Sequence, residues 1–334
     1  MSQEKIQKQV LKQSGNAESF VQDFFFGQNG IVREGRIGRA HLVFDSRTQG
    51  WVGLPHGGIG MGAMVELAGT LDACPAERGL RYPMSLEYRL GGSPARIGDV
   101  AMAEVSAGDG HISGRITIGE DPSPYLTAAI RYGIQDPEDH EDVLSRLPKD
   151  ASALLENWVS LPHYKYCFVC GTERKHPGLN RSFYLLGSSL PDKIIVSPIG
   201  LDAGDLHTVC RFQEDGLIHP VVFLALLDET VGWGGFMASG SGGVTVRIRF
   251  TFERDIRDGE RILIFGRGDR VRGKAPRLLY WGSGGAVAVQ DDGRLEPVIA
   301  VSGQYLGVPE LTEQMKVELR PEDLTRRAFD MAGM

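Results

Sequence analysis

The sequence contains few cysteines and no long uninterrupted apolar run, and each scarcity excludes a class of protein. Its 334 residues include four cysteines, too few and too scattered for a disulfide framework, so we expect reduced thiols. No run approaches the roughly 20 apolar residues that a membrane span needs. The first fifteen residues are polar and lack the apolar core of a signal peptide. We therefore expect a cytoplasmic protein with no membrane partner.

The chain also lacks an excess of positive charge. It has 36 lysines and arginines against 43 aspartates and glutamates, a net charge of −7. Nucleic-acid binders usually carry a basic footprint, so we expect no nucleic-acid partner. The hydrophobic fraction of 42% with 24% charged residues is typical of a globular protein. This length favours two domains with full-sized cores.

The first half of the chain reads as strands, one apolar helix, and more strands. After a short amphipathic segment at 20–26, strands are predicted at 32–44, 82–90, 100–107, 111–118 and 125–133. The helix is predicted from His56 to about Ala73 and is apolar almost all round, as expected of a helix wrapped by a sheet. The charged segment 136–150 contains Pro137 and Pro148 and is predicted to be a linker. We place the domains at 1–148 and 149–334.

The second half repeats this order. Strands are predicted at 181–186, 193–198, 207–212, 244–253, 261–267, 277–282 and 297–305, with a helix from about 220 to 237. The helix starts align His56 with His219, an offset of 163, and the strands that follow align Ser85 with Thr245, an offset of 160. Near-equal offsets indicate an internal duplication. Each unit is therefore an antiparallel sheet with one long buried helix, an α+β fold.

A short segment in the second half resembles a known family. The run Cys167-Phe168-Val169-Cys170-Gly171, followed by His176-Pro177-Gly178-Leu179 and Phe183, resembles the opening signature of a large branch of the hotdog thioesterase superfamily. In that family, a histidine-glycine-glycine turn and a helix bearing an acidic residue follow the segment. The resemblance implies two tandem hotdog domains, a double hotdog, in which each sheet wraps around a long central helix.

The spacing of Cys167 and Cys170 also allows another interpretation. Two cysteines so placed often bind one zinc ion, and His163 and His176 lie nearby in the sequence. A second cysteine pair is lacking, so a small buried structural segment is the favoured interpretation. We expect no metal and no cofactor.

The resemblance assigns roles to the turn at the start of the first helix. In the family, the first glycine of this turn donates its backbone N–H to the thioester oxygen, where the helix N-terminus adds partial positive charge. Here that glycine is Gly57, His56 braces the turn, and Gly58 lets the substrate approach the backbone. The alternative is that both glycines serve close packing of strand on helix.

The two halves have lost complementary parts of this site. The corresponding turn of the second half has Pro220 in place of Gly57, and proline has no N–H. The family's acid lies nine positions after the histidine, which gives Asp228 after His219 but Val65 after His56. Because the resemblance implies that each site takes its donor from one unit and its acid from the other, we predict one composite site, Gly57 facing Asp228. The alternative for Asp228 is a structural hydrogen bond.

Four further residues are weaker candidates. Glu229 and Glu66 occupy equivalent positions just beyond the acid position, and each is a candidate for substrate binding, although a shared structural contact fits them better. Thr245 matches a position where the family often has a hydroxyl that orients the attacking water; a plain strand threonine is nearly as good a reading. Gln49, before His56, is a candidate for binding the water or the carbonyl.

These residues lead to hydrolysis of an acyl-CoA thioester as the first hypothesis, with Asp228 as general base or as nucleophile. Arg89, Arg96 and Arg254 are candidate contacts for the coenzyme A phosphates, with a solvated surface as the better interpretation. One alternative function is an enoyl-thioester hydratase or dehydratase, whose Asp-x-Asn-Pro-x-His pattern we do not find. The other is a non-catalytic acyl-CoA-binding protein. Association of double units into a homo-oligomer stays open.

Overall fold

The computed structural model describes residues 20–27, 30–71, 80–91, 93–133, 157–176, 178–187, 193–201 and 209–334. The predicted linker at 136–150, the domain boundary at 148/149 and the polar start at 1–15 lie outside these residues. The placement of the boundary therefore stays a prediction.

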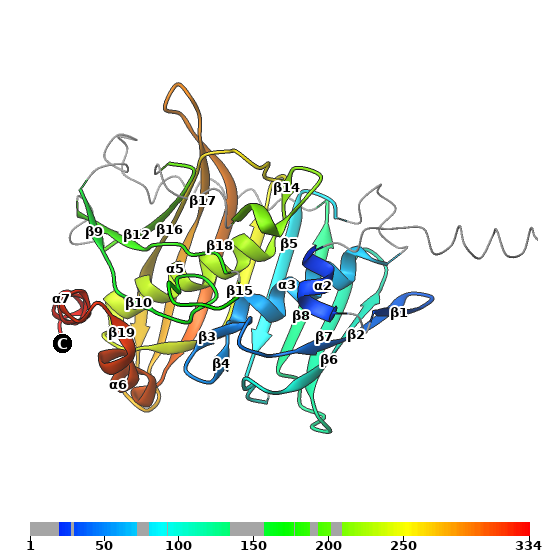
Figure 1. The fold of residues 1–334 in the computed structure, drawn as a ribbon, viewed down its shortest axis with the longest axis horizontal. Coiled ribbons are helices and arrows are strands. Elements are labelled where there is room, and N and C mark those ends of the chain that lie inside the picture. Colours follow the sequence, from blue (N-terminus) through cyan, green and yellow to red (C-terminus); the bar gives the residue numbers. More distant parts are fainter. Residues whose placement is uncertain are drawn as a thin grey trace, which may run out of the picture.

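Thirteen strands of the described chain form one antiparallel sheet that runs through both halves (Figure 1). The first half contributes β1 (Ile31–Glu34), β2 (Ile37–Val43), β5 (Met84–Leu90), β6 (Val100–Ala107), β7 (Ile112–Ile118) and β8 (Leu126–Tyr132). The second contributes β9 (Trp158–Ser160), β11 (Tyr184–Leu186), β12 (Ile195–Ile199), β15 (Gly243–Phe252), β16 (Ile262–Arg272), β17 (Leu279–Val289) and β18 (Leu295–Gly307). Their order is β1-β2-β6-β7-β8-β5-β15-β18-β17-β16-β12-β11-β9. The halves join where β5 pairs with β15, Met84 opposite Phe252.

Two long helices lie side by side against one face of this sheet, α3 (Gly57–Gly69) from the first half and α5 (Val221–Ser239) from the second (Figure 1). A Cβ on Gly58 would overlap the backbone of Ala225, and a Cβ on Gly62 would overlap the side chain of Val221. Going along α3 from Gly58 to Gly62, the partner on α5 moves back from Ala225 to Val221, so the helices are antiparallel. Each half is a sheet wrapped around one helix, and together they form the predicted α+β double hotdog.

Both central helices are buried on nearly all sides. Helix α5 is long and apolar enough to pass as a membrane span by length and composition, although Asp228 and Glu229 interrupt its apolar run. Most of α5 is buried inside the protein, as the core helix of a wrapped sheet must be. Its apolar character therefore follows from the fold.

Shorter elements complete the described chain. They are α2 (Phe20–Phe26), the strand pairs β3 (Gln49–Trp51) with β4 (Leu54–Pro55) and β13 (Gln213–Glu214) with β14 (Leu217–Ile218), the 3₁₀ helix η4 (Val209–Phe212), and β10 (His163–Tyr164) paired with β19 (Leu319–Arg320). The C-terminal helices α6 (Pro309–Glu318) and α7 (Glu322–Ala332) flank β19 and were not anticipated from the sequence.

Several predicted elements differ from the structure; helix α3, for example, ends at Gly69 rather than near Ala73, and β16 continues past 267 to Arg272. The strand expected at 207–212 is wrong over its described part, because Val209–Phe212 is a 3₁₀ helix. The ring of Phe212 packs against Phe24 and Phe168, and such tertiary contacts override strand propensity. The strand expected to end near 282 continues to Val289, because its glycines allow close approach to β16. A Cβ on Gly282 would stand 2.7 Å from the backbone oxygen of Arg267.

Candidate active site

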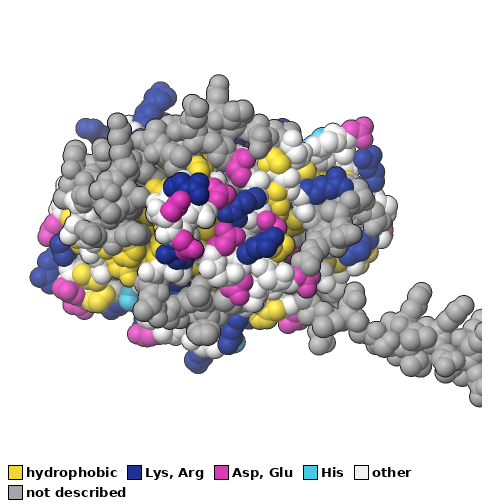
Figure 2. All heavy atoms as spheres, turned by 90° about the horizontal axis from the view of Figure 1, so that it is seen from above, with side chains coloured by type: hydrophobic (Ala, Val, Ile, Leu, Met, Phe, Trp, Pro, Cys, Tyr) yellow, Lys and Arg dark blue, Asp and Glu magenta, His cyan; other side chains and the backbone are white. Residues whose placement is uncertain are grey.

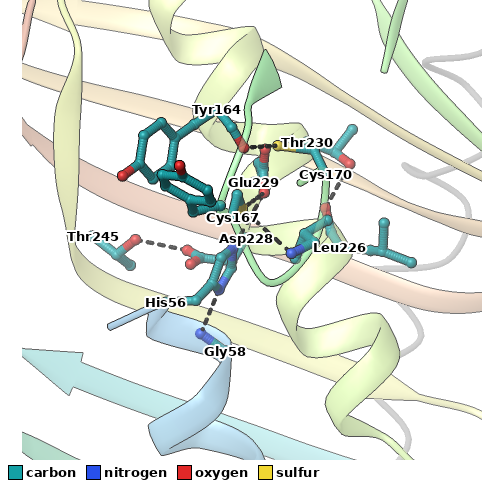
Figure 3. Close-up of polar contacts among 12 residues, drawn as sticks. His56, Gly58, Tyr164, Cys167, Cys170, Leu226, Asp228, Glu229, Thr230 and Thr245 are labelled. Carbon is teal, nitrogen blue, oxygen red and sulfur yellow. Dashed lines mark hydrogen bonds and ion pairs between the residues drawn. The ribbon is translucent and has the colours of Figure 1, made fainter. Parts of the chain in front are cut away.

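The turn at the start of α3 is held by its own histidine. Nδ1 of His56 accepts a hydrogen bond from the N–H of Gly58 at 3.1 Å, so the side chain caps the helix (Figure 3). Gly57 is the first residue of the helix, and an N–H at that position has no acceptor within the helix itself. Partial positive charge gathers at the same end. The turn thus offers one backbone donor to an incoming oxygen.

Asp228 lies close to Gly57, although 171 positions separate the two residues in the sequence. A Cβ built on Gly57 would stand 2.8 Å from Oδ2 of Asp228. The hydroxyl of Thr245 donates a 2.6 Å hydrogen bond to Oδ1, and the two side chains point toward each other (Figure 3). The structure therefore brings together the donor of one half and the acid of the other.

Burial changes the acidity of Asp228. The side chain is 8% exposed, and loss of solvation raises its pKa above the ordinary value. The charge of His56 and the hydrogen bond from Thr245 act in the opposite direction, and Glu229 raises the pKa further. A carboxylate whose pKa is moved toward neutrality is a better base at neutral pH.

Glu229 is bound to protein groups on both sides. Nε2 of His56 lies 3.3 Å from its Oε2, and the thiol of Cys167 donates to the same oxygen at 3.3 Å. Sγ of Cys167 in turn accepts a hydrogen bond from the N–H of Val169. This chain of contacts links the α3 turn, the 167–170 segment and α5. Glu229 therefore serves to hold these segments together rather than to bind a ligand freely.

The protonation of His56 follows from its two contacts. Burial lowers its pKa, but the hydrogen bond to Glu229 and the nearby negative charges raise it to about 9. A ring protonated on both nitrogens, as a pKa of about 9 implies at neutral pH, could not accept the Gly58 N–H, because Nδ1 would have no lone pair. The capped arrangement is therefore that of the neutral ring, with its proton on Nε2 and donated to Glu229. In this arrangement neither ring nitrogen is available to take a proton from a substrate.

The arrangement of a turn histidine beside a glutamate recurs at the start of α5, but the residues that correspond to Gly57 and Asp228 are different there. Nδ1 of His219 accepts from the N–H of Val221 at 3.1 Å, and Nε2 lies 3.2 Å from Oε2 of Glu66. Each histidine therefore pairs with a glutamate of the opposite half, which is the shared structural contact expected of these glutamates. Here the donor position is Pro220 and the acid position is Val65, which is fully buried.

Helix α2 fills the space beside this second turn. The ring of Phe25 lies 6.1 Å from the ring of His219 and close to Gly62 of α3. Phe25 is 3% exposed and belongs to the main core. The half-site around His219, where Pro220 and Val65 stand in place of the donor and the acid, is thus filled by aromatic packing.

The half-site around Asp228 opens into a cavity of about 180 Å³. The polar residues that line it are His56, His163, Asp228, Glu229 and Thr245. Apolar and aromatic residues make most of the remaining wall, from α5, β17, β18 and the C-terminal segment. Such a cavity, largely apolar with a few convergent polar groups, is the usual form of a small-molecule site.

Other predicted residues lie away from this cavity or are already engaged. The side-chain amide of Gln49 donates to the backbone oxygen of Trp51 and to the hydroxyl of Tyr164, and Gln49 is not among the described residues that line the cavity. Arg254 is paired with Glu260 and Glu296.

The other two candidate phosphate contacts, Arg89 and Arg96, lie at the surface, and Arg89 is paired with Glu87. On the face seen from above, basic and acidic side chains are interspersed (Figure 2). The solvated interpretation therefore fits these two arginines best.

The residues that could bind a metal in the structure are not the set suggested by the sequence. Cys167 and Cys170 are buried, and His176 is exposed. The ligand atoms that lie within 4.8 Å of one another belong to His56, Cys167 and Glu229. Zinc accepts these three ligand types. Binding through Nε2 would require His56 to give up its contact with Glu229, so hydrogen bonding accounts for this cluster better.

Sequence reasoning missed two contributions to the site. The hydroxyl of Tyr305 donates to the backbone oxygen of Asp228 at 3.3 Å, and Leu311 and Met315 of α6 form part of the cavity wall. Neither lies in a local motif. The one available signal was the apolar spacing of Leu311 and Met315, one turn apart on a helix.

Comparisons with known proteins yield similarity of fold at low sequence identity. No protein-family model and no curated protein sequence matches the chain. A tesB protein from Mycobacterium avium subspecies paratuberculosis is 14% identical with a TM-score of 0.49, covering 84% of this chain and 96% of that one. The acyl-CoA thioesterase II TesB2 from Mycobacterium marinum is 13% identical with a TM-score of 0.45, covering 87% and 97%.

Dehydratases also appear among the similar structures. The dehydratase domain of PpsC from Mycobacterium tuberculosis, in complex with C12:1-CoA, is 14% identical with a TM-score of 0.49, covering 84% of this chain and 98% of that one. The similar structures thus include proteins named as a thioesterase and as a dehydratase. By its continuous antiparallel sheet and its two wrapped helices, this chain is a tandem double-hotdog protein.

Proposed function

We propose that the chain hydrolyses an acyl-CoA thioester at one composite site between its two halves. The observation that carries this proposal is the closeness of Gly57, the first residue of α3, to the carboxylate of Asp228, which lines a largely apolar cavity together with His56 of the same turn. A thioester oxygen on the Gly57 N–H places the carbonyl carbon beside a buried carboxylate. Donor and base are the two groups that acyl transfer to water requires.

In this mechanism Asp228 removes a proton from water, the hydroxide adds to the thioester carbon, and negative charge develops on the oxygen bound to Gly57. The tetrahedral intermediate then collapses with departure of the coenzyme A thiolate. A direct attack by Asp228, forming an anhydride that water cleaves, uses the same groups. Thr245 orients the carboxylate, since its proton is donated to Oδ1. His56 holds the turn through its cap.

Hydrolysis suits the site better than hydration or dehydration of an enoyl thioester. In the capped arrangement His56 has Nδ1 engaged with Gly58 and Nε2–H engaged with Glu229, so it is not available as a proton-transfer group. Crotonyl-CoA distinguishes the reactions. Loss of the enoyl absorbance without free thiol would indicate water addition, and free thiol with the enoyl group intact would indicate hydrolysis.

The test of the proposal is thiol release over short, long and aromatic acyl-CoAs. Asp228→Asn should lower kcat by about 100-fold or more, the usual contribution of a general base. Gly57→Pro removes the N–H at a helix position that proline tolerates but also adds a Cβ beside Asp228, so it should lower kcat further than Gly57→Ala, which adds the Cβ and keeps the N–H. Full turnover by either variant would refute its assigned role. Tight binding of acyl-CoA with no thiol release by the parent protein would favour a non-catalytic binding protein.

A further inference from the structure

Helix α5 contains three glycines in its interior, and packing explains two of them. A Cβ on Gly234 would stand 2.6 Å from the backbone of Arg267, and a Cβ on Gly235 would overlap the ring of Tyr280. At Gly232 the nearest atom to an added Cβ is in the ring of Tyr305, at 3.9 Å. Glycine weakens a helix interior, so its presence needs a reason. At Gly232 the reason is open space, because this residue lines the cavity.

The cavity follows one face of α5 away from the acid. Asp228, Gly232 and Phe236 line it, spaced four residues apart and therefore on the same side of the helix. At 1.5 Å per residue, this face extends about 12 Å from the carboxylate. Tyr280 and Tyr305 form one wall, with their rings stacked 5.2 Å apart. An acyl group bound at Asp228 would therefore run along α5 over Gly232.

The C-terminal helix α6 closes the cavity beside the turn that follows α5. Leu311 and Met315 line the cavity, and Sδ of Met315 lies 2.5 Å from where a Cβ of Gly242 would be. Two hydrogen bonds tie this helix to the site: the indole N–H of Trp51 donates to Gln314 at 2.9 Å, and the N–H of Gly242 donates to the hydroxyl of Thr312 at 3.0 Å. This wall belongs to the folded core of the site, since Met315 is 9% exposed.

We propose that this cavity selects a compact acyl group, about the size of a single aromatic ring, with Gly232 providing the room and Met315 limiting the length. The inference rests on the proposed hydrolysis for its kinetic test. A cavity of about 150 Å³ lined by apolar side chains accommodates benzene. The cavity here, about 180 Å³ with aromatic walls, therefore suits a phenylacetyl or a branched short-chain acyl group, whereas most of a long chain would lie outside it.

The first test fills the space above Gly232. The parent protein should hydrolyse phenylacetyl-CoA and isovaleryl-CoA with a kcat/KM at least ten-fold above that for palmitoyl-CoA. Gly232→Leu should lower kcat/KM for phenylacetyl-CoA at least ten-fold more than for acetyl-CoA, and Gly232→Ala should do so less strongly. Thermal unfolding should show both variants folded, because alanine and leucine favour a helix more than glycine does.

The second test removes the wall at Met315. Met315→Ala should raise the ratio of octanoyl-CoA to phenylacetyl-CoA turnover several-fold. Val317→Ala is the matched control, because Val317 lies on the same helix but is 64% exposed, and it should leave this ratio unchanged. An unchanged acyl preference in both Gly232→Leu and Met315→Ala would overturn the inference, as would equal turnover of palmitoyl-CoA and phenylacetyl-CoA by the parent.

Binding separates this inference from the proposed function. If the parent releases no thiol from any acyl-CoA, hydrolysis is wrong, and dissociation constants of phenylacetyl-CoA and palmitoyl-CoA then test the cavity alone. Tighter binding of phenylacetyl-CoA, weakened at least ten-fold by Gly232→Leu, would still support the inference. Equal affinities in the parent and the variant would overturn it.

Discussion

A single methyl group placed between the two halves should disable the site while leaving the fold intact. In Gly57→Ala the new Cβ would stand 2.8 Å from Oδ2 of Asp228, about 0.6 Å short of an ordinary contact. The carboxylate is held on its other side by Thr245 at 2.6 Å, so it must move or the turn must move. Catalytic groups need placement within about 0.5 Å, and a misplacement of about 1 Å costs about 100-fold.

We therefore expect Gly57→Ala to lower kcat by about 10- to 100-fold, or about 1.4 to 2.7 kcal/mol of transition-state stabilisation. The assay is thiol release from phenylacetyl-CoA, with thermal unfolding measured alongside. Gly58→Ala is a comparison rather than a neutral control, because its Cβ would overlap the backbone of Ala225 and force apart the two helices that bring Gly57 to Asp228. That variant should lose about 1 to 3 kcal/mol of folding stability through overpacking of the two helices.

A double variant identifies the route of the effect. If Gly57→Ala acts by displacing the carboxylate, adding it to Asp228→Asn should cost little beyond Asp228→Asn alone, since the two residues act as a unit. Multiplying losses would show that the two residues act independently and would refute the reasoning. Full kcat in Gly57→Ala would refute it directly.

Three further predictions follow from the same geometry. Hydrolysis needs the ionised form of Asp228, and burial raises the pKa of this residue, so kcat should fall as pH drops through that raised pKa. Thr245→Val removes a hydrogen bond that lowers this pKa, so the acid limb of the kcat profile should move to higher pH. Thr245→Ser should restore the original profile. Glu229→Gln should lower kcat several-fold while Glu66→Gln, its counterpart at the filled half-site, should not, and equal effects would contradict a single site. Phe25→Ala should reduce the free energy of unfolding by about 3 to 5 kcal/mol in denaturant titrations without loss of kcat, and a large loss of kcat would contradict the separation of the two half-sites.

The structure changed the interpretation of several predicted residues without removing the central pair. Thr245 directs its hydroxyl to Asp228 rather than to a free water position, and Glu229 lies between His56 and Cys167. Gln49 does not line the cavity, and its amide is bonded to Trp51 and Tyr164, which do. Each of these differences depends on contacts between side chains that lie far apart in the sequence, and no local spacing could have revealed them.

The covalent structure of single residues and the periodicity of the sequence were enough to predict the loss of one site and the repeated fold of the two halves. Pro220 has no N–H and Val65 has no carboxylate whatever the fold, so the loss of one site could be inferred from the residues alone. The repeated order of strands and one apolar helix per half was likewise enough for two α+β units, and the resemblance of the segment from Cys167 to Phe183 added the expectation of a double hotdog.

Which groups meet depends on packing between distant parts of the chain. The closeness of Gly57 and Asp228 requires two helices to pack antiparallel through Gly58 and Gly62, which is a matter of side-chain volume between segments far apart in the sequence. The filling of one half-site by α2 and the closing of the other by α6 depend on where these outer helices pack. Such long-range contacts are set by the shape of the whole core rather than by any one segment.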